Sequence, residues 1–289
     1  MGGVLKAAAR RIRTRRASTF PVARAIANAA CGLEIGGPST IYAPGGLLPI
    51  YALAGQIDNC NFATATIFGN NSPEPRAGSS AGLSQGGFRA FNAGRTPGRE
   101  FIMEGRRLTM IANEAYDFVL CSHMLEHTAS PLTALAEWRR VLRHAGGIIV
   151  VLPHRDGTFD HRRPLTDIEH LVKDFDEDVG EDDTTHIAEV LELHDLALDY
   201  GVESASAFRE RVRHNASNRG VHHHVFDTRL AMTVVSRAGF EVLAVEALLP
   251  YHIILMARKA DRPPLDMAAA FDRFAGALLN SPFPSDHRK

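Results

Sequence analysis

Two histidines and a glutamate follow a short apolar run in the middle of the chain. His123, Glu126 and His127 have the spacing i, i+3 and i+4. If a helical turn begins at Ser122, these side chains converge on one face. Neutral ring nitrogens and a carboxylate oxygen are good ligands for a divalent cation. A histidine that titrates near pH ~6.5 can also accept a proton from an alcohol.

The elements around this group form a strand, a helix and a second strand. Residues 118–121 and 148–152 are continuous apolar runs, typical of strands buried on both faces of a parallel sheet. Between them, Ser130-Pro131 predicts a helix start and Gly146 its end. This is a βαβ unit.

Parallel strands joined by a crossover place their carboxyl ends at one edge of the sheet, where ligands bind. Ser122 and His123 end the first of these strands, and His154 ends the second. We therefore expect all three residues at the ligand edge.

The run YDFVLCSHMLEHTASPLTALAEWRRVLRHAGGIIVVLPH, from Tyr116 to His154, carries a resemblance. It resembles the fourth strand, helix and fifth strand of class I S-adenosylmethionine-dependent methyltransferases, in particular a broad group with Leu-Glu-His after strand four. The resemblance implies S-adenosylmethionine as cofactor. Another doubly wound α/β domain is the alternative, because periodicity alone does not distinguish the two.

An earlier glycine turn fits this resemblance. Residues 31–35 form a short apolar strand before Gly36-Gly37, where backbone N–H groups can approach a ligand closely. In the family, an acid and such glycines hold the methionine end of the cofactor. The resemblance implies these roles for Glu34, Gly36 and Gly37. Prolines at 38, 44 and 49 argue against a long helix after the turn.

Three further residues are candidates for the rest of the cofactor. We predict a second strand at residues 50–57, followed by Asp58, whose carboxylate would accept the ribose hydroxyls. The alternative for Asp58 is a plain turn. Glu104 follows a predicted third strand at 100–103, where related enzymes hold the adenine amino group. Ser122 completes the predicted cofactor set.

A triple histidine supplies further candidate ligands. The pattern His-x-x-Glu-His resembles the Glu-x-x-Glu-His of small-RNA 2'-O-methyltransferases, where another histidine completes a metal site. His222 and His224 would share a face of a strand and complete it here. The predicted metal set is His123, Glu126, His127, His222 and His224. The alternative is that Leu-Glu-His only holds the fold together by hydrogen bonds.

Without a metal, a histidine is the expected catalytic group. His127, His123 and His154 are the candidates for the base that takes the proton of an alcohol acceptor. The chain lacks an Asn-Pro-Pro-Tyr or Asp-Pro-Pro-Tyr after the fourth strand, which marks methylation of amino groups. This absence favours an oxygen acceptor.

Composition limits the class of protein. The formal net charge of -1 gives no general attraction to nucleic acid or acidic membrane, and no apolar run reaches the roughly 20 residues of a membrane span. Three cysteines without a CxxC pair indicate a reducing compartment, so we predict a cytoplasmic location.

The predicted fold is an α/β, Rossmann-like, seven-stranded and mostly parallel sheet with an antiparallel last strand. We divide the chain into a basic helical segment at 1–30, a methyltransferase domain at 31–259 and a C-terminal helix and tail at 260–289. The domain carries a helical insertion at 155–220 after strand five, over the active site. The basic segment has no acid before Glu34. It suits a transit peptide or a lipid or RNA contact, but we favour a helix packed across the cofactor mouth.

The predicted function is methyl transfer from S-adenosylmethionine to an oxygen of a small molecule or saccharide. Two alternatives remain: a metal-dependent hydrolase that uses the His and Asp clusters, and a cofactor-binding module without catalysis. The sequence does not define the oligomeric state.

Overall fold

The fold is built on one seven-stranded sheet, seen here in a computed structural model that describes residues 16–63, 98–261 and 266–287. The strand order is β3-β2-β1-β4-β5-β7-β6. Pairs among β1 to β5 are parallel, whereas β7 runs antiparallel to β5 and β6. The predicted fold class is thus confirmed. The strands are β1 (Cys31–Ile35), β2 (Gln56–Asn61), β3 (Glu100–Ile102), β4 (Tyr116–Ser122), β5 (Leu142–Pro153), β6 (Phe240–Leu248) and β7 (His252–Lys259).

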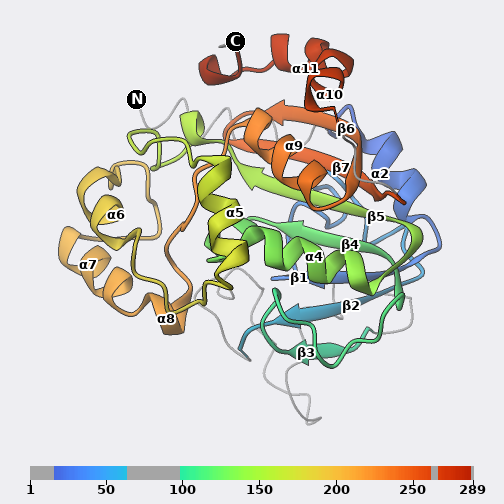
Figure 1. The fold of residues 1–289 in the computed structure, drawn as a ribbon, viewed down its shortest axis with the longest axis horizontal. Helices are drawn as coiled ribbons and strands as arrows, with labels where there is room; N and C mark the ends of the chain where they lie inside the picture. The colour runs from blue at the N-terminus through green and yellow to red at the C-terminus, as the bar shows by residue number, and fades with distance from the viewer. Residues whose placement is uncertain (1–15, 64–97, 262–265, 288–289) are drawn as a thin grey trace.

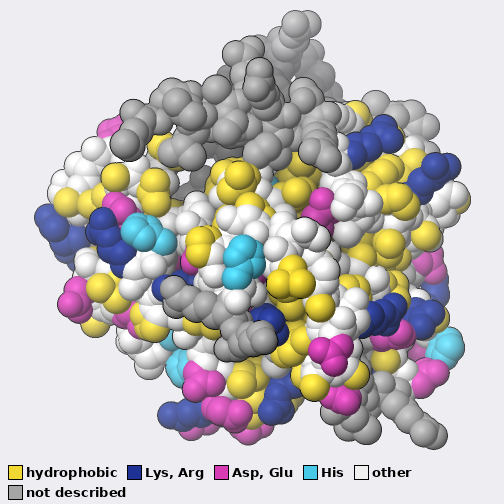
Figure 2. Space-filling model, turned by 90° about the horizontal axis from the view of Figure 1, so that it is seen from above, with side chains coloured by type: hydrophobic (Ala, Val, Ile, Leu, Met, Phe, Trp, Pro, Cys, Tyr) yellow, Lys and Arg dark blue, Asp and Glu magenta, His cyan; other side chains and the backbone are white. Residues whose placement is uncertain are grey.

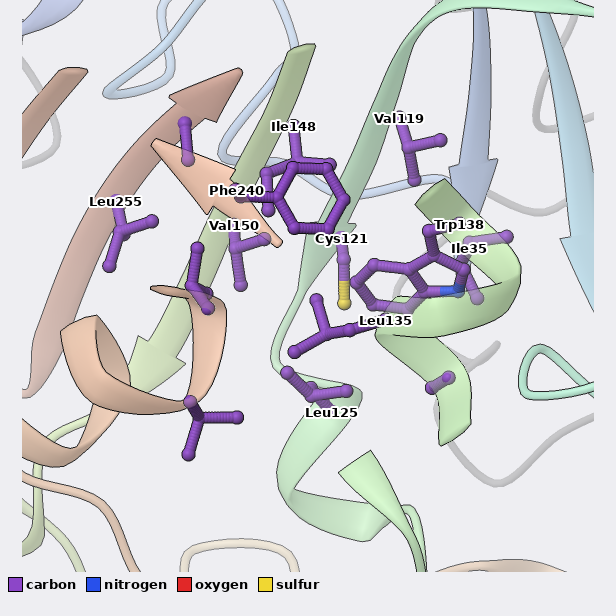
Figure 3. Close-up of a cluster of buried hydrophobic side chains, with 14 of the residues drawn as sticks. Ile35, Val119, Cys121, Leu125, Leu135, Trp138, Ile148, Val150, Phe240 and Leu255 are labelled. Carbon is purple, nitrogen blue, oxygen red and sulfur yellow. The ribbon is translucent and has the colours of Figure 1, made fainter. Parts of the chain in front are cut away.

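One face of the sheet is covered by α4 (Pro131–Val141) and α9 (Thr228–Arg237), which lie in front of the strands in Figure 1. Trp138 on α4 is fully buried, and its indole N–H donates to the carbonyl of Gly105 at 2.9 Å. Figure 3 shows its ring beside Ile35 and Leu135, among side chains of β1, β4 and β5. The central strands are therefore buried on this face by a continuous apolar layer.

The other face is covered by α2 (Phe20–Ala27) and by the loop between β1 and β2. No helix follows the glycine turn in this loop, as its prolines predict. Tyr42 is fully buried there, and its hydroxyl donates to the carbonyls of Cys121 and Ile149. The helix α2 packs on β4 and β5 through Ala23 and Ala27. Our prediction of a helix across the cofactor mouth is wrong for this segment, because its apolar stripe is buried against the sheet; residues 1–15 lie outside the described residues.

Residues after β5 form four helices beyond the carboxyl ends of the parallel strands. The four helices are α5 (Ile168–Asp176), α6 (Ile187–Leu193), α7 (Ala205–Arg213) and α8 (Asn215–Asn218). A short 3₁₀ turn, η3 (Arg155–Gly157), precedes them. Figure 1 shows α6, α7 and α8 on the side toward which the β2 arrow points. A small separate core at Val190, Phe208, Val212 and Val221 holds this group together. The N-cap of α5 is Asp167, whose carboxylate accepts from the backbone N–H of Glu169.

The hairpin that ends the sheet follows its predicted pattern. Asp227 caps α9 by accepting from the backbone N–H of Leu230 at 2.7 Å, and Gly239, with φ +86°, closes that helix. The strands β6 and β7 then pair antiparallel around Pro250. None of the described helices combines the length and the apolar character that a membrane span requires.

The described part of the C-terminal segment, residues 266–287, docks onto the core. After α10 (Met267–Arg273) and α11 (Ala275–Leu279), the 3₁₀ turn η4 (Pro284–His287) brings Asp286 into the interior. Asp286 accepts hydrogen bonds from the Thr228 and Ser281 hydroxyls, both at 2.6 Å, and lies 3.2 Å from Nε2 of His154. These three partners supply the polar contacts that a buried carboxylate requires.

We expect Asp286→Ala to lower the free energy of unfolding by about 3 kcal/mol or more, because it leaves several buried polar groups without a partner. Asp272→Ala on the exposed face of α10 is the control and should change this free energy by less than about 0.5 kcal/mol. Urea denaturation of both variants measures the difference. Equal stability of the two would contradict the assignment of Asp286 as the anchor of the tail.

Candidate active site

The glycine turn after β1 meets the end of β4. The parallel pairing places Ile35 opposite Cys121, so Gly36 lies next to Ser122 at the carboxyl edge. Gly36 has φ +77°, and a Cβ there would lie 2.9 Å from Cγ of Met124. Glycine is therefore required at this position by both backbone conformation and space.

Glu34 lies beneath this turn and not in the cavity. It is buried, and the Tyr51 hydroxyl lies 2.8 and 2.7 Å from its two carboxyl oxygens. The backbone N–H of Ser39 donates to Oε1 at 3.1 Å. Burial raises the pKa of Glu34 to about 8, although the hydrogen bonds from Tyr51 and Ser39 act in the opposite direction. Glu34 thus fixes the path of the loop, and Gly37 packs directly over its side chain.

A cavity of about 440 Å³ opens at this edge. Five residues predicted from the sequence line it, from the ends of β1, β3 and β4 and from the turn after β4: Gly36, Glu104, Ser122, His123 and His127. Its size lies within the range of small-molecule and cofactor sites. This cavity lies at the edge of the sheet where we predicted that the cofactor binds.

Asp58 does not line this cavity. The second strand is β2 at Gln56–Asn61 and not at 50–57, so Asp58 lies inside the strand. Its carboxylate accepts from the Tyr116 hydroxyl at 2.6 Å and from the Arg99 backbone and guanidinium, and Gln56 also donates to it. Asp58 therefore does not lie where we predicted the ribose-binding carboxylate, and these partners occupy both of its oxygens. Asn61, at the carboxyl end of β2, lines the cavity instead.

Hydrogen bonds and ion pairs between charged residues connect the insertion to the wall of this cavity. Arg219, in the segment after α8, donates to Oε1 of Glu104 at 2.6 Å and to the backbone carbonyl of Glu181 at 3.0 Å. Arg106 lies 3.5 Å from the Glu181 carboxylate. All four residues line the cavity. Glu104 is therefore where we predicted it, but one of its oxygens is already engaged by the insertion.

A second cavity, of about 800 Å³, shares His123 and His127 with the first. Its walls come from η3, the insertion, the β6–β7 turn and the C-terminal segment. Apolar and aromatic side chains predominate among them: Phe159, Leu198, Tyr200, Leu249, Tyr251 and Phe283. A small group of polar side chains lies at the junction with the first cavity, including Glu126 and His222. Such a site suits an apolar molecule with a few polar atoms.

The side chains at this junction surround one buried carboxylate. Oε1 of Glu126 lies 3.9 Å from Nε2 of His127, 3.9 Å from Nε2 of His222 and 3.6 Å from Nδ1 of His123. Glu126 is fully buried, and neither of its oxygens has a hydrogen-bond partner among the described residues. A buried carboxylate without such a partner is costly unless a cation or a substrate group satisfies it.

Hydrogen bonds on the far side of two rings orient them. Nδ1 of His127 lies 3.0 Å from the carbonyl of Val221, which can only accept, so Nδ1 carries the proton. Nδ1 of His222 lies 2.5 Å from Oδ2 of Asp160, which the Arg163 guanidinium holds at its other oxygen. Both arrangements direct Nε2 toward Glu126. A ligand histidine in a metal site is held in the same way, by a carbonyl or carboxylate at its other nitrogen.

The pKa values at the junction fit this arrangement. Burial, together with the neighbouring His222, lowers the pKa of His127 to about 3, so its ring is neutral at pH 7. Burial acts to raise the pKa of Glu126, but the adjacent His123, His127 and His222 outweigh it and lower that pKa. The Glu126 carboxylate is ionised beside the neutral ring of His127. A base with so low a pKa is weak at neutral pH, so His127 suits a ligand better than a proton acceptor.

His123 adopts a left-handed backbone conformation with φ +50° and does not begin a helix. The helical turn after β4 is the 3₁₀ turn η2 (Leu125–His127). Our prediction of one helical face for the three residues is therefore wrong, although their side chains still converge. Nε2 of His123 lies 3.0 Å from Nδ1 of His252, and the ring lines both cavities.

Two predicted histidines lie elsewhere. His154 is fully buried, stacks on Phe283 and pairs with Asp286, so it lines neither cavity. Its predicted catalytic role is wrong, because the docked C-terminal segment covers it. His224 does not join Glu126 either, since residues 222–224 form a loop in which His222 and His224 point to different groups.

Comparison with known proteins agrees with this geometry. Residues 91–151 match the family model described as "Methyltransferase domain". The matched residues include the strand, η2 and helix that build the junction. Over these residues the chain is similar to methyltransferase domains.

Solved structures similar to this chain include three S-adenosylmethionine-dependent methyltransferases. The protein from Aquifex aeolicus is 10% identical with a TM-score of 0.44, over 86% of this chain and 93% of its own. The protein from Methanosarcina mazei is 11% identical with a TM-score of 0.43, over 83% and 97%. The protein from Mesorhizobium loti is 14% identical with a TM-score of 0.43, over 84% and 98%. No curated protein matches the chain by sequence.

The sequence analysis missed several residues of the site. Asn61 was not predicted because the second strand was placed too early, at residues 50–57 and not at Gln56–Asn61. Asp160 and Arg219 come from the insertion, six residues after His154 and three residues before His222. No local pattern distinguishes them from solvated charges.

We expect Gly36→Ala to weaken S-adenosylmethionine binding at least about tenfold, because the added methyl group strains the turn and displaces Met124. Gly45→Ala is a matched control, since Gly45 also has a positive φ (+85°) but an added Cβ there meets no atom within 4 Å. Isothermal titration with the cofactor measures both. Equal affinity of the two variants would refute the role of the Gly36 turn.

Glu34 predicts a dependence of stability on pH. Because its folded pKa is raised from 4.5 to about 8, the stability that it contributes is fully present below the unfolded pKa and is lost as pH rises through the folded one. Glu34→Gln retains the shape without a charge. Between pH ~6 and ~9, wild type should lose a few kcal/mol more of its unfolding free energy than this variant. Chemical denaturation across this range measures it; parallel curves would disprove the raised pKa.

Proposed function

We propose that this protein is an S-adenosylmethionine-dependent methyltransferase that transfers the methyl group to a hydroxyl oxygen of a small molecule bound in the second cavity. The single observation that carries the proposal is the buried Glu126 carboxylate, with Nε2 of His127 and His222 turned toward it, at the junction of the two cavities. This is the place where the cofactor methyl group and an acceptor bound on either side would meet.

The walls of the second cavity support the class of acceptor. Phe159, Leu198 and Tyr200 give it an apolar surface, while the polar groups gather at the junction. This lining suits an alcohol or phenol with an apolar body, and a saccharide that stacks on an aromatic ring is the second class. Figure 2 shows basic, acidic and hydrophobic side chains interspersed over the face in view, without a continuous basic surface. Such a surface supports a small acceptor over a nucleic acid.

The residues at the junction fit a divalent cation. Glu126 and the Nε2 atoms of His127 and His222 lie within 4.8 Å of one another, and the carboxylate lacks another partner among the described residues. Two imidazoles and one carboxylate leave coordination positions open for an acceptor oxygen, as in catalytic sites. When bound, such a cation would lower the pKa of the acceptor hydroxyl.

The chain's own residues account for the remaining steps. The Gly36 turn and Ser122 would hold the cofactor so that its methyl group faces the junction. The second cavity would align the acceptor oxygen for in-line attack, and alignment of this kind contributes up to ~7 kcal/mol or more. His123 borders both cavities and lies beside Glu126, so it is our candidate for removing the hydroxyl proton. Of the three histidines predicted as candidates for the general base, we therefore propose His123.

The two alternatives make different predictions at the same site. A metal-dependent hydrolase would bind the cation at Glu126 and hydrolyse its substrate without S-adenosylmethionine. A module without catalysis would bind S-adenosylmethionine and give no methylated product with any acceptor. Incubation of a panel of apolar alcohols, phenols and saccharides with isotopically labelled cofactor, followed by intact-mass analysis, separates all three.

We expect Glu126→Gln to reduce turnover at least about 100-fold while S-adenosylmethionine affinity changes less than about threefold. The amide has the same shape but no charge to offer a cation or an acceptor proton. Single-turnover rates and calorimetric titration measure the two effects, and Glu241→Gln on the surface of β6 is the control. Unchanged turnover in Glu126→Gln would exclude this carboxylate from the reaction.

A further inference from the structure

A second group of potential ligands lies in the inserted helices, apart from both cavities. His170 and Asp174 are one turn apart on α5, His186 is the residue before α6, and His224 lies in the loop before α9. None of these four residues lines the cofactor or the acceptor cavity. The group therefore needs an explanation of its own.

The four side chains converge on a small volume. One ligand atom of each lies within 4.8 Å of the others. Nε2 of His170 is 3.0 Å from Nε2 of His186 and 3.3 Å from Oδ2 of Asp174. Ligands of a tetrahedral zinc ion at ~2.0–2.1 Å are separated by about 3.4 Å. The observed spacing is close to that of such a shell.

Two buried atoms in the group have no hydrogen-bond partner among the described residues. They are Oδ2 of Asp174 and Nδ1 of His224. Asp174 is 7% exposed and His224 is 1% exposed, so solvent does not readily satisfy either atom. Polar atoms left in this state destabilise a fold unless a further group binds them. A cation between the side chains would satisfy the carboxylate oxygen and the ring.

His224 is also held in the way that a ligand histidine is held. Its Nε2 lies 3.0 Å from the backbone carbonyl of Ala129, just before α4. A carbonyl can only accept, so Nε2 carries the proton and Nδ1 has the lone pair. This contact fixes the tautomer and the ring orientation in the manner of known metal sites. It also connects the group to the helix that packs on the sheet.

We propose that His170, Asp174, His186 and His224 bind one structural zinc ion. Three imidazoles and one carboxylate provide four protein ligands, which closes a tetrahedral site and leaves no position for a substrate. The ion would join α5, the start of α6 and the loop before α9, three segments that are distant in the sequence. This site is separate from the proposed cation at Glu126 and does not depend on it.

The location of the ion has a consequence for the cofactor cavity. The segment between α5 and α6 carries Glu181, which lines that cavity and accepts from the backbone N–H of Ala129. Ligands on both sides of this segment, at Asp174 and His186, would hold its two ends. Zinc should therefore order the segment and raise the affinity for S-adenosylmethionine.

The test uses the full chain, stripped with a chelator and titrated with Zn²⁺. The Glu126→Gln background removes the other proposed site, and bound zinc is measured by atomic emission after dialysis. We expect one equivalent in Glu126→Gln and a loss of affinity of about 100-fold or more when His170→Asn is added. His170 is half-exposed, so this change should leave the fold intact. His214→Asn is the control, because His214 also pairs with an acid one turn away on a surface helix.

A second readout follows the structure of the insertion. Zinc should slow hydrogen exchange at residues 168–190 in the Glu126→Gln protein and not in the protein that also carries His170→Asn. Absence of bound zinc in Glu126→Gln would overturn the proposal, and so would equal binding with and without His170→Asn. A loss on Asp183→Asn with none on His170→Asn would also overturn it, because the ion would then lie on the neighbouring group of Asp183, His186 and His223.

Discussion

The parallel pairing of β1 with β4 is the constraint on which the site depends. It places the glycine turn after Ile35 beside Ser122, so a ligand held by backbone groups of the first strand lies next to side chains that follow the fourth. The apolar layer around Trp138 on one face and Tyr42 on the other fixes this pairing. A shift of one residue in register would move the buried side chains of either strand to the opposite face.

The site also requires that the negative charge of the Glu126 carboxylate be stabilised in the protein interior. Glu126 has no hydrogen-bond partner of its own among the described residues, and His127 and His222 are held at Nδ1 so that each turns Nε2 toward the carboxylate. Such an arrangement is unfavourable in an empty protein and favourable around a cation or a polarised hydroxyl. Groups that destabilise the ligand-free protein but stabilise a bound ligand are often found at active sites.

The insertion owes its position to one buried cation of the chain itself. Arg163 is 1% exposed and binds the Asp160 carboxylate, the Glu189 carboxylate and the carbonyls of His222 and His223. The structure gives it a positioning role, because its hydrogen bonds hold the histidine loop where His222 faces Glu126.

The sequence by itself determined the elements and the edge at which they present their ligands. Apolar runs and glycine turns act over a few positions, so the βαβ unit and the loop after Gly36 could be predicted from local patterns, whereas the seven-stranded arrangement was implied by the family resemblance. The contacts of a residue with distant segments could not be predicted in this way. Whether His154 faces a cavity depends on a C-terminal turn 132 residues away, and Asp58 is satisfied by Tyr116 and Arg99. The tertiary structure alone decided which histidines share a site, because ring orientation and burial are set by contacts between distant segments.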